Sequence, residues 1–313
     1  MSLLSRIKKS SDVSSAKAGD KHLLFGMPGV GKSTIASQAE SPLFVDFDRG
    51  IKQIRVDRID PAPTTWTDAL NAFREVVTDK HTYKTLVIDT IDTLEELAIQ
   101  HVLKVGRKTS MGDFGFGEGY AALKNEWRVM LSTLDAVADK SITVVLLAHS
   151  VVRQTSDPQL GPYEVYTTGL QKGTWAVTAR WCDMIGFCAF ENARIEKEKR
   201  SVYTGQRQLL TTAGSGYIAK NRWGLPRVLP LDWKALQTAI QHFYNANPAD
   251  TIARIQVLAK SLSPEVEKRA GDYITEAQGD VRRLLQVEDA LKEKLAEMAK
   301  EVVEGAKEGA TTT

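Results

Sequence analysis

The sequence has 313 residues, of which 42% are hydrophobic and 26% are charged, a composition that is typical of a folded protein and excludes a disordered chain. No apolar run approaches the roughly 18 residues that span a membrane, and the N-terminus lacks a signal-peptide core, so we expect a cytoplasmic protein with no membrane partner. The net charge is only +2, but residues 194–227 carry eight Lys or Arg against two Glu, which favours a surface that faces a polyanion.

Residues 1–20 are rich in Ser, Lys and Ala, and we expect a flexible basic arm there. An apolar strand predicted at 22–25 then runs into GMPGVGKST at 26–34. The spacing G-x-x-x-x-G-K-S is that of the phosphate loop of nucleoside triphosphatases. Its glycines let backbone N–H groups turn toward phosphate oxygens, and a helix expected from about residue 31 to 39 adds its N-terminal donors. The expected ATP-binding residues are Gly26, Pro28, Gly29, Val30, Gly31, Lys32, Ser33 and Thr34.

Two side chains of this loop carry its chemistry. Lys32 is expected to reach the β- and γ-phosphates of ATP, and the hydroxyl of Ser33 is expected to bind Mg²⁺. The alternative is a chance match in a glycine-rich turn. All eight positions match, however, and they lie between an apolar strand and a helix, which favours the phosphate loop.

The rest of a core predicted at 21–245 alternates strands with helices. Nearly continuous apolar strands separated by helices predict an α/β fold with a mostly parallel sheet, covered on both faces, and ligands at the carboxyl ends of the strands. Cys182 and Cys188 are expected to be reduced core residues. The predicted strands are 42–48, 85–89, 143–149 and 184–190, the predicted helices are 66–79, 91–105 and 118–139, and 201–213 and 216–223 are predicted to extend the sheet as antiparallel strands.

Polar residues end three of these predicted strands. Asp89 closes an apolar strand about fifty residues after the phosphate loop, where an aspartate can hold Mg²⁺. Asp48 ends the strand at 42–48, for which the alternative is a solvated strand end or a turn with Arg49 and Gly50. His149 ends the strand at 143–149, for which the alternative is a histidine that merely satisfies its hydrogen bonds at a sheet edge.

The sequence AKNR at 219–222 follows a short predicted strand. Because strand side chains alternate, Lys220 and Arg222 are expected on one face. Such a pair can bind the phosphates of a nucleic acid, or those of a nucleotide held by a neighbouring subunit. A surface charge pair is the alternative.

Residues 246–313 are predicted to form a separate C-terminal helical region. The stretch NANPAD at 245–250 breaks the chain, SPE at 263–265 opens one helix, and a long final helix follows from residue 280. Its charges alternate along the solvent side, which is typical of a docking or coiled helix. Residues 249–313 hold ten Lys or Arg against thirteen Asp or Glu, so this appendage is acidic.

The segments GMPGVGKST, VDFD, TLVIDTID, LLAHS and GYIAKNR, in this order, resemble the RecA-like ATPases, and in particular the phage nucleotide-binding group that includes the Sak-type single-strand annealing and recombination proteins. The resemblance covers about residues 20–235 and leaves out the arm and the C-terminal helices. It implies that Lys32 and Ser33 bind phosphate and magnesium and that Asp89 is the magnesium carboxylate.

The same resemblance assigns catalytic roles to four further residues. It implies that Asp48 orients the attacking water as the base, that His149 senses the γ-phosphate, and that Lys220 and Arg222 enter the site of the next subunit. Many relatives have Glu at the position of Asp48, so hydrolysis is expected to be slow. Thr90 stands where AAA+ proteins place a Glu, so that second pattern is missing.

The resemblance also implies two DNA-binding loops, at about 106–120 and 150–175. Cations that meet the DNA backbone and rings that stack on bases are what single-strand binding requires. Long loops of this kind can also be merely mobile. The expected DNA-binding residues are Arg107, Lys108, Phe114, Phe116, Arg153, Lys172 and Trp175.

The sequence therefore predicts a Mg²⁺-dependent ATPase that binds single-stranded DNA as a homo-oligomeric ring or filament and serves phage-type recombination or strand annealing. Hydrolysis is expected to be DNA-stimulated, in a bacterial host cytoplasm if a phage encodes the chain, with a single-strand-binding protein as a candidate partner. The alternatives are a DnaB-like helicase or helicase loader, a small-molecule kinase, and a nucleotide-dependent scaffold with no DNA role.

Overall fold

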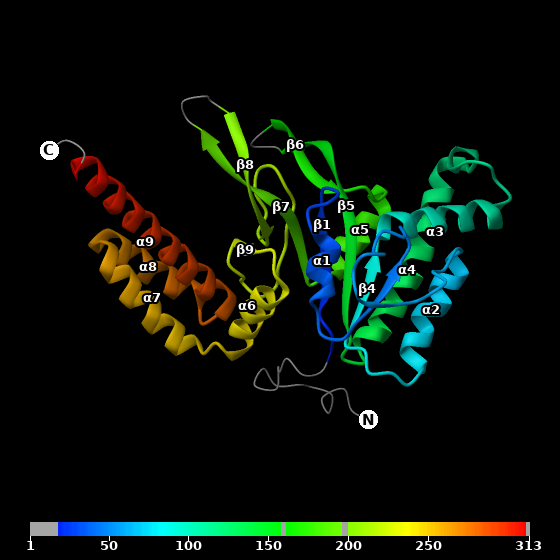
Figure 1. Cartoon of the computed structure of the whole chain (residues 1–313), viewed down its shortest axis with the longest axis horizontal. Helices are drawn as coiled ribbons and strands as arrows, with labels where there is room; N and C mark the ends of the chain where they lie inside the picture. The colour runs from blue at the N-terminus through cyan, green and yellow to red at the C-terminus, as the bar shows by residue number, and fades with distance from the viewer. Residues whose placement is uncertain (1–17, 158–160, 196–199, 311–313) are drawn as a thin grey trace. The chain divides into compact units, whose positions relative to one another are not determined.

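The computed structural model describes residues 18–157, 161–195 and 200–310 (Figure 1). Most of the predicted basic arm at 1–20 therefore lies outside the described residues. The chain divides into two compact units, of which the first holds the residues up to 221 together with 228–236, and the second holds 222–227 together with 237–313. The three-part division at residues 20 and 245 stays a prediction.

The first unit is built on a mixed sheet whose strands follow the order β3-β2-β4-β5-β1-β7-β8-β9, with β6 paired to β5. The strands from β3 to β7 in this order run parallel, and β8 and β9 are antiparallel to their neighbours. The predicted α/β fold with a mostly parallel sheet and an antiparallel extension is confirmed. The strand bounds are β1 Lys21–Gly26, β2 Pro42–Asp46, β3 Asp57–Arg58, β4 Thr85–Asp89, β5 Thr143–Asp157, β6 Gly161–Thr168, β7 Met184–Ile195, β8 Arg200–Leu210 and β9 Val228–Pro230.

Helices cover both faces of this sheet. On one face, alternate strand residues such as Leu23 and Leu146 share a core with Trp66 of α2, Leu94 of α3 and Trp127 of α4. On the other face, α1 packs against β1 and β5, and the ring of Trp233 at the start of α6 meets His22 edge-on. The helix bounds are α1 Lys32–Ser37, α2 Trp66–Thr78, α3 Ile91–Gly106, α4 Glu118–Ala138, α5 Lys172–Trp181 and α6 Trp233–Asn245.

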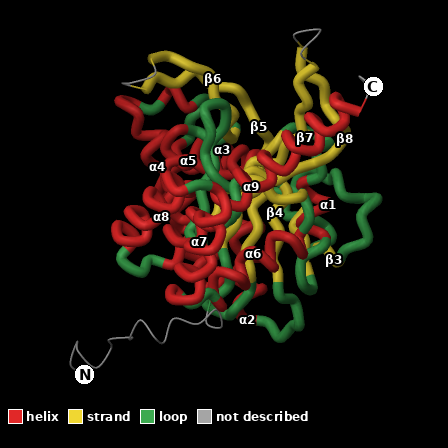
Figure 2. Tube along the Cα trace, turned by 90° about the vertical axis from the view of Figure 1, so that its left-hand side faces the viewer, coloured by secondary structure: helices red, strands yellow, loops and turns green. Residues whose placement is uncertain are grey.

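Two hairpins rise beyond the parallel part of the sheet, as Figure 2 shows for β5 with β6 and for β7 with β8. Gly26, the last residue of β1, pairs with His149 of β5 and with Cys188 of β7. Both neighbouring strands continue past this level, to Asp157 and to Ile195. The phosphate loop that follows β1 therefore begins at the base of the two hairpins.

Two expectations for this unit are wrong. The segment 150–175, expected as a loop, is largely the hairpin of β5 and β6 followed by α5, because its half-buried and exposed residues alternate with the period of a strand. The segment 216–223, expected as a strand, makes only isolated bridges, such as the one between Ile185 and Lys220. Gly216 lies in a turn at the start of this segment, and residues 222 and 223 form a bend at its end.

The helices of the C-terminal region are α7 Pro248–Leu262, α8 Pro264–Ala277 and α9 Val281–Ala310. Asn247 and Ser263 cap α7 and α8 by accepting hydrogen bonds from the backbone N–H groups of Ala249 and Val266. An apolar cluster that includes Ile255 and Leu284 joins the three helices. Among the described helices, none is both long and apolar enough to cross a membrane.

One ion pair fixes α7 to α9. The buried carboxylate of Glu288 accepts two hydrogen bonds from the guanidinium of Arg254, each 3.0 Å long, and one of 2.8 Å from Lys292. Burial by itself raises the pKa of Glu288, but these cations outweigh it and hold the pKa below its ordinary value. Such a two-pronged pair orients the helices because both hydrogen bonds require one geometry.

Candidate functional site

The phosphate loop starts where β1 ends, between two longer strands. A side-chain Cβ at Gly26 would lie 2.3 Å from the carbonyl oxygen of Cys188, so only glycine fits this close approach to β7. Gly31 has a φ of 109° at the start of α1, a conformation that glycine adopts without strain. The local sequence therefore dictates both the turn and its position against the sheet.

Lys32 is buried, and its ammonium lies back on its own loop. Nζ donates hydrogen bonds to the carbonyl oxygens of Gly26 (2.9 Å) and Met27 (3.2 Å), and lies 3.5 Å from Nδ1 of His149. Burial lowers the pKa of Lys32, while nearby carboxylates, among them Asp89, oppose the shift. The ammonium thus lies at the position where phosphate oxygens are expected, and loop carbonyls accept its hydrogen bonds.

Ser33, near the start of α1, and Asp89, the last residue of β4, are in direct contact although β5 lies between β4 and β1, the strand before the phosphate loop. The hydroxyl of Ser33 donates a hydrogen bond of 2.6 Å to Oδ2 of Asp89, which is 5% exposed. Burial raises the pKa of Asp89, and the hydrogen bond from Ser33 opposes this shift. A hydroxyl and a carboxylate side by side are the hard oxygen ligands that fit Mg²⁺. Within the described residues no group of three metal-binding side chains occurs, so phosphate and water oxygens would have to complete the shell.

Asp48 lies in the loop after β2, close to Asp89. Its carboxylate accepts hydrogen bonds from the hydroxyls of Thr90 (3.1 Å to Oδ2) and Thr93. The backbone N–H groups of Phe47 and Asp48 both point at the carbonyl oxygen of Asp89. The residue that stands in place of the AAA+ glutamate, Thr90, therefore helps to orient Asp48.

His149 connects the lysine to this aspartate. Its Nδ1 faces Nζ of Lys32, and its Nε2 lies 3.4 Å from Oδ2 of Asp48. Lys32 can only donate, so a hydrogen bond between Nζ and Nδ1 requires Nδ1 to accept, which leaves Nε2 to donate to Asp48.

Two carboxylates of α3 tie His149 to the segment before α5. Oδ2 of Asp92 accepts a hydrogen bond of 2.8 Å from the backbone N–H of His149, and Glu95, one turn later, accepts from the N–H of Gln171 at 3.0 Å and from the hydroxyl of Thr174. Burial raises the pKa of both carboxyl groups, and these hydrogen bonds oppose the rise. Through these two carboxylates, α3 contacts both His149 of β5 and Gln171 in the segment that follows β6.

Sequence reasoning left Glu95 and Thr93 out of the site. The available signal was the spacing of Asp92 and Glu95, three residues apart on the helix that directly follows Asp89. This spacing places both carboxylates on one face of the helix. The signal is weak, because acidic residues in such an apolar helix ordinarily face solvent.

Some of the expected DNA-binding side chains are exposed, and the others contact the rest of the protein. Arg107 and Lys108 are exposed at the end of α3, and Phe116 is fully exposed before α4. Phe114 instead packs against Gly106 and Gly119, where a Cβ would lie about 2.5 Å from its ring. Of the others, Arg153 donates hydrogen bonds to the carbonyls of Gly169 and Leu170, Trp175 packs on the core, and Lys172 is exposed at the start of α5. Their binding of DNA stays a prediction.

Lys220 and Arg222 do not share a strand face, because no regular strand forms there. Nζ of Lys220 donates to the carbonyl oxygens of Ala179 (2.8 Å) and Cys182 (2.7 Å) at the end of α5, where the helix dipole favours a cation. Arg222 belongs to the second unit. Their role in a neighbouring subunit's site stays a prediction.

Arg207 of β8 is a further cation beside the phosphate loop. A Cβ at Gly31 would lie 3.2 Å from Nη1 of Arg207, and the guanidinium stands 5.8 Å from the ring centre of Phe190. Among the described ion pairs of the chain, none involves Arg207. The basic composition of residues 194–227 indicated a cationic segment but did not single out Arg207. Strand pairing alone decides which cation of this segment faces the phosphate loop.

A family model described as AAA domain matches residues 18–223, which include the phosphate loop, Asp48, Asp89 and His149. Two solved structures are similar at low identity. The crystal structure of the RadB recombinase is 13% identical, with a TM-score of 0.36, over 62% of this chain and 81% of that chain. The flagellar accessory protein FlaH from Methanocaldococcus jannaschii is 10% identical, with a TM-score of 0.33, over 62% of this chain and 77% of that chain.

A search of curated proteins finds no match. The family match spans more than half of the chain and includes the buried lysine, the contact of Ser33 with Asp89, and the histidine that lies between Lys32 and Asp48. The chain belongs to the AAA domain family, with a phosphate loop at residues 26–33.

Proposed function

We propose that the chain is an ATPase that binds ATP with Mg²⁺ and uses it, as an oligomer, to act on single-stranded DNA in recombination or annealing. The observation that carries the first part is the hydrogen bond of 2.6 Å from Ser33 to Asp89, one residue from a buried Lys32. Two elements that are far apart in the sequence, the start of α1 and the end of β4, meet there. A phosphate loop that already touches a carboxylate is prepared for a nucleotide with its metal ion.

In this proposal each side chain has a distinct role. Lys32 leaves its loop carbonyls and donates to the phosphate oxygens, and Ser33 and Asp89 hold the metal ion directly or through water. Bound Mg²⁺ would neutralise charge on the β- and γ-phosphates. Asp48, held by Thr90 and Thr93, orients the attacking water and accepts its proton.

The link to DNA rests on the connection behind His149. The contacts from His149 to Asp92 and from Glu95 to Gln171 lead from the nucleotide to the hairpin of β5 and β6. Exposed Arg107, Lys108 and Phe116 provide the cations and the ring that suit a flexible polyanion. These features favour a DNA-responsive ATPase over a kinase, which would need an acceptor pocket beside the phosphates.

The test is ATP hydrolysis by the full chain with Mg²⁺, with and without a single-stranded oligonucleotide, together with particle size and a strand-unwinding assay. We expect hydrolysis that requires Mg²⁺, rises with DNA and proceeds without unwinding. Unwinding would favour a helicase. A monomer whose activity ignores DNA would contradict the DNA part and favour a kinase or a scaffold.

Arg207→Ala is expected to weaken ATP binding about tenfold, because a charge-assisted contact to an anion is worth about 1.5–3 kcal/mol. Arg207 lies beside the N-terminus of α1 and Lys32, and the positive charges repel one another when no anion is bound. A bound phosphate would turn this repulsion into attraction. Calorimetry would measure the dissociation constant. Arg207→Lys should retain part of the affinity, and Lys234→Ala, an exposed cation of α6, is the matched control. Unchanged affinity in Arg207→Ala would remove the residue from the site.

A mixture of two inactive variants tests whether Arg222 acts in a neighbouring subunit. Arg222→Ala keeps its phosphate loop and Lys32→Ala keeps its arginine, so a mixed assembly should recover some ATP hydrolysis. A trans-acting arginine can be worth on the order of 10³ in rate. No recovery in subunits shown by cross-linking to assemble together would end this assignment, and loss of DNA affinity in Arg222→Ala would point to a DNA contact instead.

A further inference from the structure

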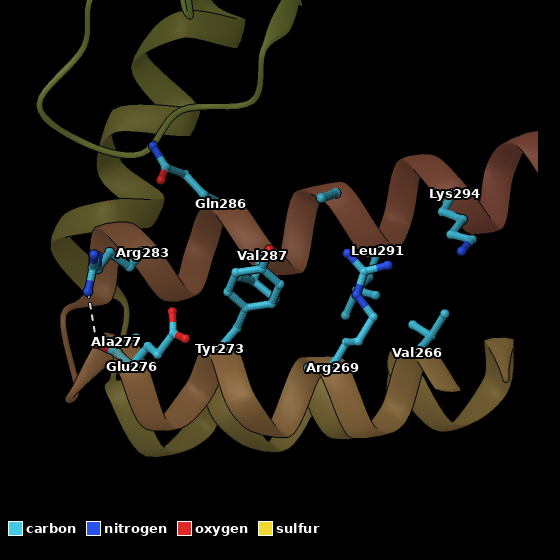
Figure 3. Close-up of a pocket in the computed structure, with 12 residues that line it drawn as sticks. Val266, Arg269, Tyr273, Glu276, Ala277, Arg283, Gln286, Val287, Leu291 and Lys294 are labelled. Atoms are coloured by element: carbon cyan, nitrogen blue, oxygen red, sulfur yellow. Dashed lines mark hydrogen bonds between the residues drawn. The ribbon is translucent and has the colours of Figure 1, made fainter. Parts of the chain in front are cut away.

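A groove runs between α8 and α9 in the second unit, on the facing sides of the two helices (Figure 3). It holds about 490 Å³, which is within the range of sites that bind ligands. Its floor is apolar, with Ala270 of α8 and Val287 and Leu291 of α9. Two small residues of α8, Ala270 and Ala277, are among the residues that line it.

Aromatic and aliphatic surface remains open in this groove. Tyr273 is 49% exposed, and Figure 3 shows its ring opposite Val287. Ala270 and Leu291 belong to the apolar cluster that α7 shares with both helices, so the floor is fixed from behind. An exposed tyrosine above a fixed apolar floor is typical of a surface that receives apolar side chains of a partner.

The net charge of the residues that line the groove is positive, whereas that of the whole C-terminal region is negative. Three cations, Arg269, Arg283 and Lys294, line it against the single carboxylate of Glu276. Over residues 249–313, by contrast, acidic residues outnumber basic ones by thirteen to ten. The region therefore concentrates positive charge at its groove although it is acidic as a whole.

Two of these cations are available to a partner. Arg283 donates a hydrogen bond of 2.8 Å to the carbonyl oxygen of Glu276 and so closes the end of α8. In the described part of the chain, neither Arg269 nor Lys294 forms an ion pair, and both side chains are exposed. Exposed cations beside an apolar floor attract carboxylates that stand next to apolar side chains.

We propose that the groove between α8 and α9 binds an acidic amphipathic helix of another protein. Apolar side chains on one face of that helix enter over Ala270, Val287 and Leu291, and its carboxylates meet Arg269 and Lys294. A helix suits the site because two antiparallel helices present a straight groove for residues spaced three and four apart. Single-stranded DNA fits less well, because Tyr273 is the only ring that lines the groove and the remaining floor is aliphatic.

The experiment measures fluorescence anisotropy of a labelled peptide with the full chain at about 0.15 M salt. The probe has about 15 residues, with Leu on one helix face and Glu on the other, a length that a groove can hold in helical form. The test variant is Arg269→Glu with Lys294→Glu. The matched control is Lys260→Glu with Lys268→Glu, which alters two exposed cations of α7 and α8 that do not line the groove and changes the net charge equally.

We expect the wild type and the control to bind alike and the test variant to bind at least about tenfold more weakly, since each reversed charge repels the probe. A second probe, with Ser in place of Leu, should bind the wild type at least about tenfold more weakly, because it gives up apolar burial. This arm needs no variant and so does not depend on how a variant folds.

Three results would overturn the proposal. Equal losses in the test variant and the control would show attraction by net charge alone, and equal binding of the Leu and Ser probes would exclude the apolar floor. A test variant that binds the peptide normally but loses affinity for a single-stranded oligonucleotide, or that loses self-association, would assign the groove to DNA or to a second copy of the chain.

Discussion

Lys32→Ala is expected to lower ATP hydrolysis by several powers of ten, the largest effect of any single substitution in this chain. The ammonium of Lys32 is the buried cation of the phosphate loop, and charge that develops on the phosphoryl group in a closed site depends on such a donor. Single-turnover hydrolysis would measure the loss, and binding of a fluorescent nucleotide would separate it from a loss of affinity.

The fold of the Lys32→Ala protein should persist. Lys32 makes its two shorter hydrogen bonds to carbonyls of its own loop, and its contact with Nδ1 of His149 is a long one of 3.5 Å, so thermal unfolding should stay close to that of the wild type. Lys52→Ala, which removes an exposed lysine of the same unit, serves as the control. Full turnover in Lys32→Ala would contradict the assignment of this loop to phosphate.

Asp48→Asn is expected to bind ATP normally and to hydrolyse it about 10²- to 10⁴-fold more slowly, since the carboxamide does not accept the proton of the attacking water. The substitution keeps the shape of the side chain and one oxygen for the hydroxyls of Thr90 and Thr93. Calorimetry for ATP binding and steady-state hydrolysis would give the two quantities separately.

Asp139→Asn, at an exposed carboxylate after α4, is the matched control for this change. If Asp48→Asn retained full activity, the base would have to be sought at Asp92. That residue already accepts the backbone N–H of His149, so its substitution would also disturb the histidine. A change in nucleotide affinity would therefore accompany a loss at Asp92 but not at Asp48.

The sequence was sufficient for the parts of the site that local chemistry dictates. The strand at 85–89 has the predicted bounds, because a continuous apolar run between polar residues admits few alternatives. The expectation that Asp89 lies beside the phosphate loop followed from the carboxyl ends of parallel strands, and the hydrogen bond from Ser33 to Asp89 agrees with it. The glycine spacing predicted the phosphate loop. At Gly26 the structure gives the reason, because the close approach of this residue to Cys188 excludes any other residue.

The parts that depend on distant pairing were not predictable in this way. Lys220 was expected on a strand face, but the carbonyls at the end of α5 hold its ammonium, and nothing near 216–223 in the sequence indicates that partner. Arg207 reaches Gly31 only because β8 pairs with β7 in one register. Exposed and half-buried residues alternate along the β5–β6 hairpin, as in a strand, but the segment was expected to be a loop.

The position of Lys32 has a consequence for which anions the loop can select. Its ammonium is already satisfied by two carbonyls, and an arriving anion must compete with them for the same donors. We expect inorganic phosphate or a monophosphate, which offers few oxygens within reach of the loop, to compete poorly. A triphosphate would engage the backbone N–H groups with one phosphoryl group while another draws the lysine away, so we expect the loop's own carbonyls to act as a threshold that sorts anions by chain length.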